Sequence, residues 1–368
     1  MQRTPLDAIH RERGAKMVDF SGWAMPLLYE GILPEHRAVR TAVGVFDVSH
    51  MGEFRVRGPG AEAFLDRMVT NRIAGLAGGQ AAYTAMCYED GGTVDDLIVY
   101  PLGAGDYLMV VNASNIDKDF AWLRDHLPPA GVELEDASAA TALLAVQGPR
   151  APELVARGAG APVDDLAYYH FRRGKVWGAD ALIARLGYTG EDGFELMIAA
   201  GAAEAVWQGL FRDGADLGLR PAGLGARDTL RFESGFCLYG HELTAAVSPL
   251  EAGIAFAVKL DKEDFVGGGA LRRQKAAGPP RRLLGLRMEG ARIPRQGSTV
   301  RRNGDTIGEV TSGMYAPTLD GAYALALVRR GTGGAAMAEA GEPVEVAIRD
   351  QVFPARIVDR PFYRRKRT

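Results

Sequence analysis

Hydrophobic and polar positions along the chain follow the helical spacing in some segments and the alternation of strands in others. Residues 34–43 carry the helical spacing, and Gly44 follows where a left-handed residue would end the helix. Three apolar runs between residues 82 and 111 are separated by glycine-rich turns, and residues 116–126 return to the helical spacing. This order predicts antiparallel strands with a helix over one face of the sheet.

One arrangement occurs twice in the first half of the chain: a short apolar strand, a Gly-Pro pair and an amphipathic helix. The pairs are Gly58-Pro59 and Gly148-Pro149, which lie 90 residues apart. Two related α+β layers would give this repeat, and chance could also give it because each match is short. No βαβ alternation accompanies the repeat, so we do not expect a Rossmann-type domain.

The sequence pattern of the last quarter of the chain is that of β-strands and turns. Residues 276–282 are rich in Gly, Pro and Arg and form the best candidate for a linker. Beyond them, Asn303-Gly304 between two alternating segments is a strong hairpin signal. Further strands are expected at residues 322–328, 344–348 and 353–358. The chain is therefore predicted to be an α+β protein with antiparallel sheets and a C-terminal β barrel or sandwich.

Composition narrows the class of protein. Glycine accounts for 47 of 368 residues, well above the average usage of about 7%. Because 47% of the residues are hydrophobic and no Gly-X-Y period exists, the glycines indicate many tight turns, neither collagen nor disorder. The formal charge of −3 gives no support to a nucleic acid or an anionic membrane as partner.

Cysteine and histidine usage argues against a disulfide framework and a metal centre. The two cysteines, Cys87 and Cys237, are far apart and form no CxxC pair, which fits a reducing cytoplasm. The six histidines show no HxH or HxxxH spacing, so no metal is expected. The first 17 residues lack the apolar core of a signal peptide, and no run of 18 apolar residues could span a membrane.

Two adjacent acids, Asp95 and Asp96, are the first candidate for chemistry. They begin an apolar strand, whose alternation sends their side chains to opposite faces, so one of them would point inward. A carboxylate that faces a cavity could serve as an acid or base, because burial raises its pKa. Two solvated aspartates at a strand start would give the same pattern.

The second candidate is the segment from Gly187 to Glu195. Three glycines in seven residues predict a contorted loop that brings the backbone close to a ligand. Tyr188 and Glu195 are the side chains of this segment that could contact the ligand. An inward carboxylate at Glu195 would suit a planar ring that carries adjacent N–H groups. An outward strand glutamate fits equally well.

The third candidate is the segment from Gly223 to Glu233, where two glycines precede a helix. Arg227 and Arg231 are four residues apart and share one face of this helix, so either could orient a carboxylate or pair with Glu195 or Asp96. A surface ion pair is the alternative.

Eleven segments from residue 3 to residue 363, taken in order, carry a family pattern: residues 3–6 (RTPL), 14–20 (GAKMVDF), 44–52 (GVFDVSHMG), 95–97 (DDL), 111–113 (VNA), 147–149 (QGP), 187–195 (GYTGEDGFE), 221–228 (PAGLGARD), 238–240 (LYG), 308–313 (GEVTSG) and 361–363 (PFY). Together they resemble the aminomethyltransferases (T-proteins) of the glycine cleavage system. The resemblance implies a three-domain cloverleaf with folate in a central channel. The implied domains are residues 1–52 plus 139–275, which bind folate, an inserted α+β domain at 53–138, and a β-barrel domain at 276–368.

The resemblance also implies an activity: transfer of a one-carbon unit from an S-aminomethyl lipoyl arm on the carrier H-protein to tetrahydrofolate. The products are 5,10-methylenetetrahydrofolate, ammonia and the dihydrolipoyl carrier. Asp96 matches the catalytic aspartate of the family, Glu195 and Arg227 match the residues that bind the pterin, and Tyr188 is similar to the aromatic wall of the pocket. Further folate-binding positions implied by the resemblance are Tyr83, Asn112, Tyr168 and Tyr169, with Tyr363 and Arg364 near the mouth of the channel. Tetrahydrofolate would act as a co-substrate, with no metal.

Two other functions remain open at this point. Relatives of this scaffold include folate-dependent demethylases of small methylated compounds, which need no carrier. A folate-binding accessory protein without transferase activity is the alternative outside the enzymes. The small-residue stretch at residues 331–341 has no place in any of these interpretations.

Overall fold

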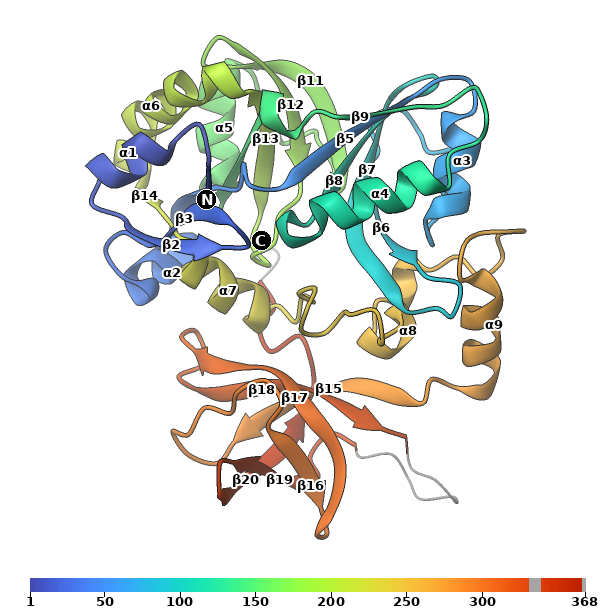
Figure 1. Cartoon of the computed structure of the whole chain (residues 1–368). Coiled ribbons are helices and arrows are strands. Elements are labelled where there is room, and N and C mark those ends of the chain that lie inside the picture. The colour runs from blue at the N-terminus through green and yellow to red at the C-terminus, as the bar shows by residue number, and fades with distance from the viewer. Residues whose placement is uncertain (331–338, 366–368) are drawn as a thin grey trace. The chain divides into compact units, whose positions relative to one another are not determined.

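The computed structural model describes residues 1–330 and 339–365, and its backbone divides into two compact units (Figure 1). Unit 1 consists of Met1–Leu65, Ile73–Tyr83 and Leu97–Leu230. Unit 2 consists of Asp66–Arg72, Thr84–Asp96 and the chain from Arg231 onward. Each unit is therefore built from segments that are distant in sequence.

A six-stranded sheet forms the centre of unit 1, in the order β11-β12-β13-β10-β4-β14. Its neighbours are antiparallel except for β14, which is parallel to β4. The strands are β4 (Val43–Asp47), β10 (Thr141–Gln147), β11 (His170–Val176), β12 (Ala179–Arg185), β13 (Gly193–Ala199) and β14 (Leu219–Pro221). Strand β10 reads TALLAVQ, an almost continuous apolar run, because both faces of the sheet are covered.

Strand alternation divides this sheet between two hydrophobic cores. On one face, residues such as Leu144 and Leu196 pack with helices α5 (Ala151–Ala159) and α6 (Ala203–Asp213). On the other face, Leu143 and Met197 belong to a second core, which includes residues of α2 (Ile32–Thr41) and α7 (Leu224–Glu233). The second face matters for function because Glu195 alternates onto it.

The helix expected at residues 34–43 exists, but its expected ending is wrong. Helix α2 ends at Thr41, and Gly44 lies inside β4 with an ordinary φ. A Cβ at Gly44 would collide with Val39, so the glycine is needed for close packing of strand on helix and ends no helix. Smaller elements before α2 are α1 (Asp7–Glu12) and a sheet of β1 (Gln2–Arg3), β3 (Trp23–Leu28) and β2 (Lys16–Phe20).

A five-stranded sheet, in the order β6-β7-β8-β5-β9, matches the prediction of antiparallel strands followed by a helix. Phe120 of α4 (Ile116–Asp125) meets Phe54 of this sheet with ring centroids 5.3 Å apart. The strands are β5 (Gly52–Arg57), β6 (Ala82–Cys87), β7 (Thr93–Gly103), β8 (Asp106–Val111) and β9 (Glu133–Asp136). Strands β6 and β7 each contribute residues to both units.

The strand, Gly-Pro, helix repeat is confirmed. Strand β5 leads through Gly58 to α3 (Ala61–Met68), and β10 leads through Gly148 to α5. Both glycines have positive φ, +115° and +134°, and a Cβ at either would collide with a backbone oxygen. The two turns therefore require glycine for the same reason.

The C-terminal part of unit 2 is a closed antiparallel barrel, in the order β15-β18-β17-β16-β19-β20. Asn303 and Gly304 form its predicted tight hairpin, both with positive φ. The strands are β15 (Arg281–Met288), β16 (Thr299–Arg302), β17 (Asp305–Ala316), β18 (Gly321–Arg329), β19 (Pro343–Ile348) and β20 (Gln351–Val358). The predicted class, α+β with a C-terminal β barrel, is confirmed.

The connection into the barrel is shorter than the predicted linker. Helix α9 (Gly268–Ala277) runs almost to β15, so only residues 278–280 lie between the two elements. Before α9, the short helix α8 (Pro249–Ala252) begins with a complete capping box between Ser248 and Glu251. Single 3₁₀ turns lie at Ala113–Asn115, Ser138–Ala140, Ala200–Ala202, Ala215–Leu217 and Ala255–Ala257.

The small-residue stretch at residues 331–341 lies, up to residue 338, outside the described residues. In the described part of the chain, no helix combines the length and the apolar character needed to cross a membrane.

Candidate functional site

Glu195 is a buried carboxyl group on a central strand of unit 1. It lies on β13 opposite Ala145 of β10, and 7% of its surface is exposed. Burial raises its pKa to about 7, and the guanidinium of Arg227 partly opposes this shift. The alternative of an outward strand glutamate is therefore wrong, and the group is held near its protonation midpoint at neutral pH.

Arg227, on a helix of the same unit, acts on Glu195 through its charge and packs against Tyr188 of a loop. The Arg227 guanidinium carbon lies 4.7 Å from the centroid of the Tyr188 ring, a cation–π contact. Burial lowers the pKa of Arg227, whereas the charge of Glu195 and the Tyr188 ring oppose that shift. The Nη1 atom of Arg227 is buried and has no hydrogen-bond partner among the described residues. A surface ion pair at Arg227 is thereby excluded.

The loop that carries Tyr188 is fixed by polar contacts within unit 1. Thr189 Oγ1 donates to Gln147 Oε1 at 2.8 Å, and Gln147 Nε2 donates to the Leu186 carbonyl at 3.1 Å. Arg40 donates to the Thr189 carbonyl at 2.7 Å and to Glu191 at 2.9 Å. The loop is thus rigidly held, which is what a binding loop requires.

Two glycines of this loop are required by the packing of a neighbouring side chain. A Cβ at Gly187 or at Gly193 would collide with the side chain of Gln147. The two glycines allow that amide to lie inside the loop and hold it together. Likewise, a Cβ at Gly223, before α7, would collide with the carbonyl of Leu27. At these three glycines, the space that a Cβ would need is therefore filled by the protein itself. Approach of the loop backbone to a ligand stays a prediction.

Two buried polar residues near Glu195 were not predicted. Glu53 on β5 and Tyr100 on β7 are both fully buried. Neither Glu53 carboxyl oxygen, nor the Tyr100 hydroxyl, has a hydrogen-bond partner within the described chain. Burial, followed by the charges of Asp136 and Glu195, raises the pKa of Glu53 well above its usual range. Burial and the nearby Glu195, Tyr169 and Glu53 also raise the pKa of Tyr100.

Sequence alternation hid Glu53. It shares one set of alternate positions with Arg55 and Arg57, and Arg57 is exposed, so the pattern describes a solvated face. On this face, exposure to solvent is reached only at Arg57, the last residue of the strand, whereas the strand is buried near Gly52. Tyr100 looked like an ordinary aromatic core residue at the end of a predicted strand.

Of the tyrosines implied by the resemblance, Tyr83, Tyr168, Tyr169 and Tyr188 lie in unit 1. Tyr168 and Tyr169 contact each other with ring centroids 4.7 Å apart, and Tyr168 is exposed. Tyr169 has a positive φ of 61°, a conformation that costs a bulky residue about 1–3 kcal/mol. Backbone bonds to Ala81 (2.7 Å) and Arg185 (2.9 Å) hold it there. Tyr83, on β6, and Asn112, directly after β8, are both half-buried.

His50 is a further buried group in this part of unit 1. Its ring lies edge-on to Phe20 with centroids 5.5 Å apart, and its Nδ1 atom has no partner in the part of the chain that the structure describes. Burial and the Arg227 guanidinium lower its pKa to about 4, although Asp47 opposes the shift. The imidazole is therefore neutral and adds no positive charge beside Arg227.

Asp95 and Asp96 belong to unit 2 and alternate as predicted. Asp95 is fully buried and Asp96 is half-buried, so the interpretation of two solvated acids is wrong. Burial, followed by the charges of Glu242 and Asp96, raises the pKa of the Cys237 thiol. Both cysteines are buried and free, which argues against a nucleophilic thiol.

Arg231, the second arginine of α7, forms a complete polar network in unit 2. It donates to Glu242 at 2.9 Å and to Ser312 at 3.1 Å. Glu242 also accepts from Thr311 and Ser312, both at 2.6 Å, and from the Leu238 backbone at 3.0 Å. Of the two arginines, Arg227 is the one whose charge acts on Glu195, whereas Arg231 bonds to Glu242 and Ser312. Pairing of Arg231 with Asp96 stays a prediction.

Tyr363 and Arg364 follow the barrel in unit 2. Tyr363 is half-buried, and its backbone N–H donates to the Glu233 carbonyl at 2.8 Å. Arg364 is exposed. The neighbouring Phe362 packs on Phe232 and Tyr323 with ring centroids 5.3 and 5.0 Å apart, which fixes this end of the chain within the unit.

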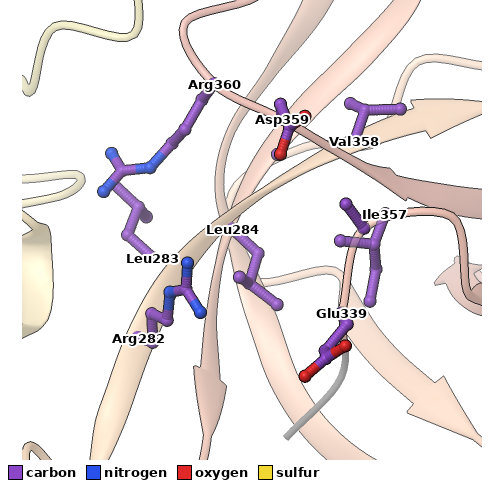
Figure 2. Close-up of a pocket in the computed structure, with 10 residues that line it drawn as sticks. Arg282, Leu283, Leu284, Glu339, Ile357, Val358, Asp359 and Arg360 are labelled. Carbon is purple, nitrogen blue, oxygen red and sulfur yellow. The ribbon is translucent and has the colours of Figure 1, made fainter.

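A separate cavity of about 500 Å³ lies in the barrel, between the start of β15 and the end of β20 (Figure 2). Arg282 and Arg360 line it together with Asp359 and Glu339, so its charges balance. It contains none of the predicted site residues. Among the described residues, no three His, Cys, Asp or Glu side chains are grouped to hold a metal ion.

Comparison with known proteins gives one consistent result. The model "GCVT N-terminal domain" matches residues 6–262, and "Glycine cleavage T-protein C-terminal barrel domain" matches residues 281–364. The chain is 50% identical to an aminomethyltransferase from Moorella thermoacetica over 99% of this chain and 98% of that one. It is also 50% identical to one from Geobacillus kaustophilus, over 99% of each. A crystal structure of glycine cleavage system aminomethyltransferase T from Bartonella henselae is 34% identical, with a TM-score of 0.90 and 98% of each chain covered.

Proposed function

The chain belongs to the glycine cleavage T-protein family of aminomethyltransferases, and from this premise we propose its reaction and its site. It transfers the one-carbon unit of an S-aminomethyl-dihydrolipoyl H-protein to tetrahydrofolate. The carbon loses its bonds to sulfur and to the amino nitrogen and gains bonds to N5 and N10 of the folate. The two hydrogens displaced from N5 and N10 appear on the released thiol and on ammonia, so the reaction balances without an oxidant.

The group of Glu195, Arg227 and Tyr188 is the observation that supports folate as the acceptor. A buried carboxylate can accept two hydrogen bonds in one plane from adjacent N–H groups, and a pterin ring presents such a donor pair. Arg227 favours the ionised form of Glu195, and its contact with Tyr188 holds the guanidinium in place. Tyr83, Asn112, Tyr168 and Tyr169 would complete the folate site, with Tyr363 and Arg364 at its mouth.

Asp96 is the proposed catalytic residue. The transferred carbon develops positive charge as its bond to sulfur or nitrogen weakens, and a fixed carboxylate lowers the energy of that charge. The half-buried position of Asp96 suits this role, because its negative charge is less screened than at the surface. No metal is required in this scheme.

The same proposal includes the domain boundaries of the chain and its location in the cell. We expect three domains, at residues 1–52 plus 139–275, at 53–138 and at 276–368, and a cytoplasmic location. The only partners proposed are the lipoylated carrier and tetrahydrofolate, with no nucleic acid or membrane.

The decisive assay mixes the protein with aminomethylated H-protein and tetrahydrofolate and follows ammonia. Release should need all three components. Asp96→Asn should retain the fold, checked by its melting temperature, and lose at least 100-fold in turnover, the scale seen when one group that stabilises developing charge is removed. Turnover close to wild type would remove Asp96 from the mechanism. Folate-dependent release of formaldehyde equivalents from a small methylated amine, with no carrier, would instead support a demethylase.

A further inference from the structure

Among the buried polar atoms of unit 1 that have no hydrogen-bond partner within the described residues, four lie on three residues around Glu195. They are both carboxyl oxygens of Glu53, the hydroxyl of Tyr100 and Nη1 of Arg227. Each orphaned buried group costs about 1–3 kcal/mol, so folded proteins keep few of them. Several in one region are therefore informative, because a ligand can supply the missing partners.

These groups share one neighbourhood, centred on Glu195. Tyr100 packs in the same core as Ala145, which lies opposite Glu195 in the sheet, and Glu53 lies opposite Val110 of that core. The charge of Glu195 acts on Glu53 and on Tyr100, and Arg227 acts on Glu195. The charged or titratable groups that face Glu53 are Asp136 from β9, Glu195 from β13 and Tyr100 from β7. In the described part of the chain, the Arg227 guanidinium favours ionisation of Glu195, whereas the charges of Asp136 and Glu195 oppose ionisation of Glu53.

The two carboxyl groups are therefore not equivalent. When two buried carboxyl groups oppose each other's ionisation, the one beside a cation ionises more readily. Glu195 has Arg227, whereas Glu53 has only Asp136 and Glu195, both negative, beside it. Glu53 consequently holds the proton. A protonated carboxyl group has one O–H donor, and the Tyr100 hydroxyl supplies a second.

We propose that Glu53 is a further ligand-binding residue, whose neutral carboxyl group donates, together with Tyr100, to acceptor atoms of the ring that Glu195 binds through its N–H edge. The inference rests on the proposed function, since a pterin carries a ring carbonyl directly beside that donor edge. Glu195 then accepts hydrogen bonds from the N–H donors of the ring, and Glu53 and Tyr100 donate hydrogen bonds to its acceptor atoms. A ring without an acceptor beside the N–H pair would leave both groups unpaired, which penalises it.

Two substitutions of similar shape separate this role from a structural one. Glu53→Gln keeps a neutral donor, and Glu53→Met keeps the volume but removes the donor. We expect Glu53→Gln to bind tetrahydrofolate within about threefold of wild type and Glu53→Met to bind roughly tenfold more weakly, the size expected for one lost hydrogen bond. Glu135→Gln, at an exposed acid on β9 beside β5, serves as the matched control and should bind like wild type.

The melting temperature of the ligand-free protein provides a readout that a structural role would not give. Glu53→Met removes an unpartnered buried carboxyl group, so it should melt at or above the wild-type temperature while binding more weakly. Calorimetric titration with tetrahydrofolate measures the affinity. Affinity of Glu53→Met equal to wild type, or weakening in proportion to a lower melting temperature, overturns the inference. Absence of tetrahydrofolate binding by the wild type overturns the proposed function itself, and this inference with it.

Discussion

Helix α7 carries two arginines four residues apart, Arg227 and Arg231, whose surroundings differ in one respect. Arg231 and Glu242 are almost fully buried, and every oxygen of Glu242 accepts a hydrogen bond. Arg227 faces the buried Glu195, but its Nη1 lacks a partner within the described residues. In the sequence, both pairs, Arg231 with Glu242 and Arg227 with Glu195, consist of an arginine and a distant glutamate, so the sequence does not distinguish them.

The difference separates a structural ion pair from a binding site. A complete network such as that of Arg231 has no bonding capacity left for a ligand, and it rigidifies its surroundings. An incomplete one is costly in the empty protein, and that cost is recovered when a ligand supplies the missing partners. We therefore expect substitutions at Arg231 to act on stability and those around Arg227 to act on binding.

The largest effect is expected from Arg231→Gln. Breaking a buried pair leaves Glu242 charged and uncompensated, which costs about 3–5 kcal/mol of the free energy of unfolding. Urea denaturation at neutral pH measures this loss. The same substitution at Arg227 should cost at most about 1 kcal/mol, because Glu195 can take up a proton instead. Equal losses for the two variants would remove the distinction.

The next effect is a pH dependence that only the Arg227 site should show. The pKa of Glu195 rises from about 4.5 to about 7 in the folded protein. The folded state then binds more protons than the unfolded state between these pH values, so stability falls as pH rises from about 4.5 to 7. The slope from this group approaches 1.4 kcal/mol per pH unit. Glu195→Gln should remove that slope; parallel stability curves for variant and wild type would show that Glu195 keeps an ordinary pKa.

The smallest effect is expected from Tyr188→Leu. Loss of the ring from beneath Arg227 removes a cation–π contact worth about 0.5–2 kcal/mol. Tetrahydrofolate should bind about 3–10-fold more weakly, measured by titration calorimetry, because the guanidinium is no longer held in place, and the melting temperature should fall by no more than the loss of this one contact implies. A variant that melts earlier but binds normally would place Tyr188 in the structural class with Arg231.

Much of this picture could be predicted from the sequence. The turn signals at Gly58, Gly148 and Asn303-Gly304 depend on local backbone geometry, so they gave the repeat and the barrel hairpin correctly. The inward position of Glu195 was one of two possibilities, because alternation gives two faces but does not say which face is covered. The family motifs nominated the candidate site residues through resemblance, independently of these patterns, and the roles of those residues stay predictions.

The rest depended on tertiary contacts that local patterns do not contain. Glu53 shares its alternate positions on the strand with Arg55 and the exposed Arg57, and only the packing of other elements buries its end of that strand. Arg231 and Arg227 are equivalent on a helical face, and the choice between them was made by Glu242, eleven residues further along the chain. The glycines of the 187–193 loop were interpreted as open to a ligand, whereas Gln147 fills the space beside Gly187 and Gly193.

The most direct test of the central claim is the affinity of Arg227→Gln for tetrahydrofolate, measured by titration calorimetry beside the wild type. The account predicts binding weakened about 10–100-fold, the range for losing a hydrogen bond to a charged group, with the folded state retained. Binding as tight as that of the wild type would contradict it, because the incomplete site on helix α7 would then not be where the folate binds.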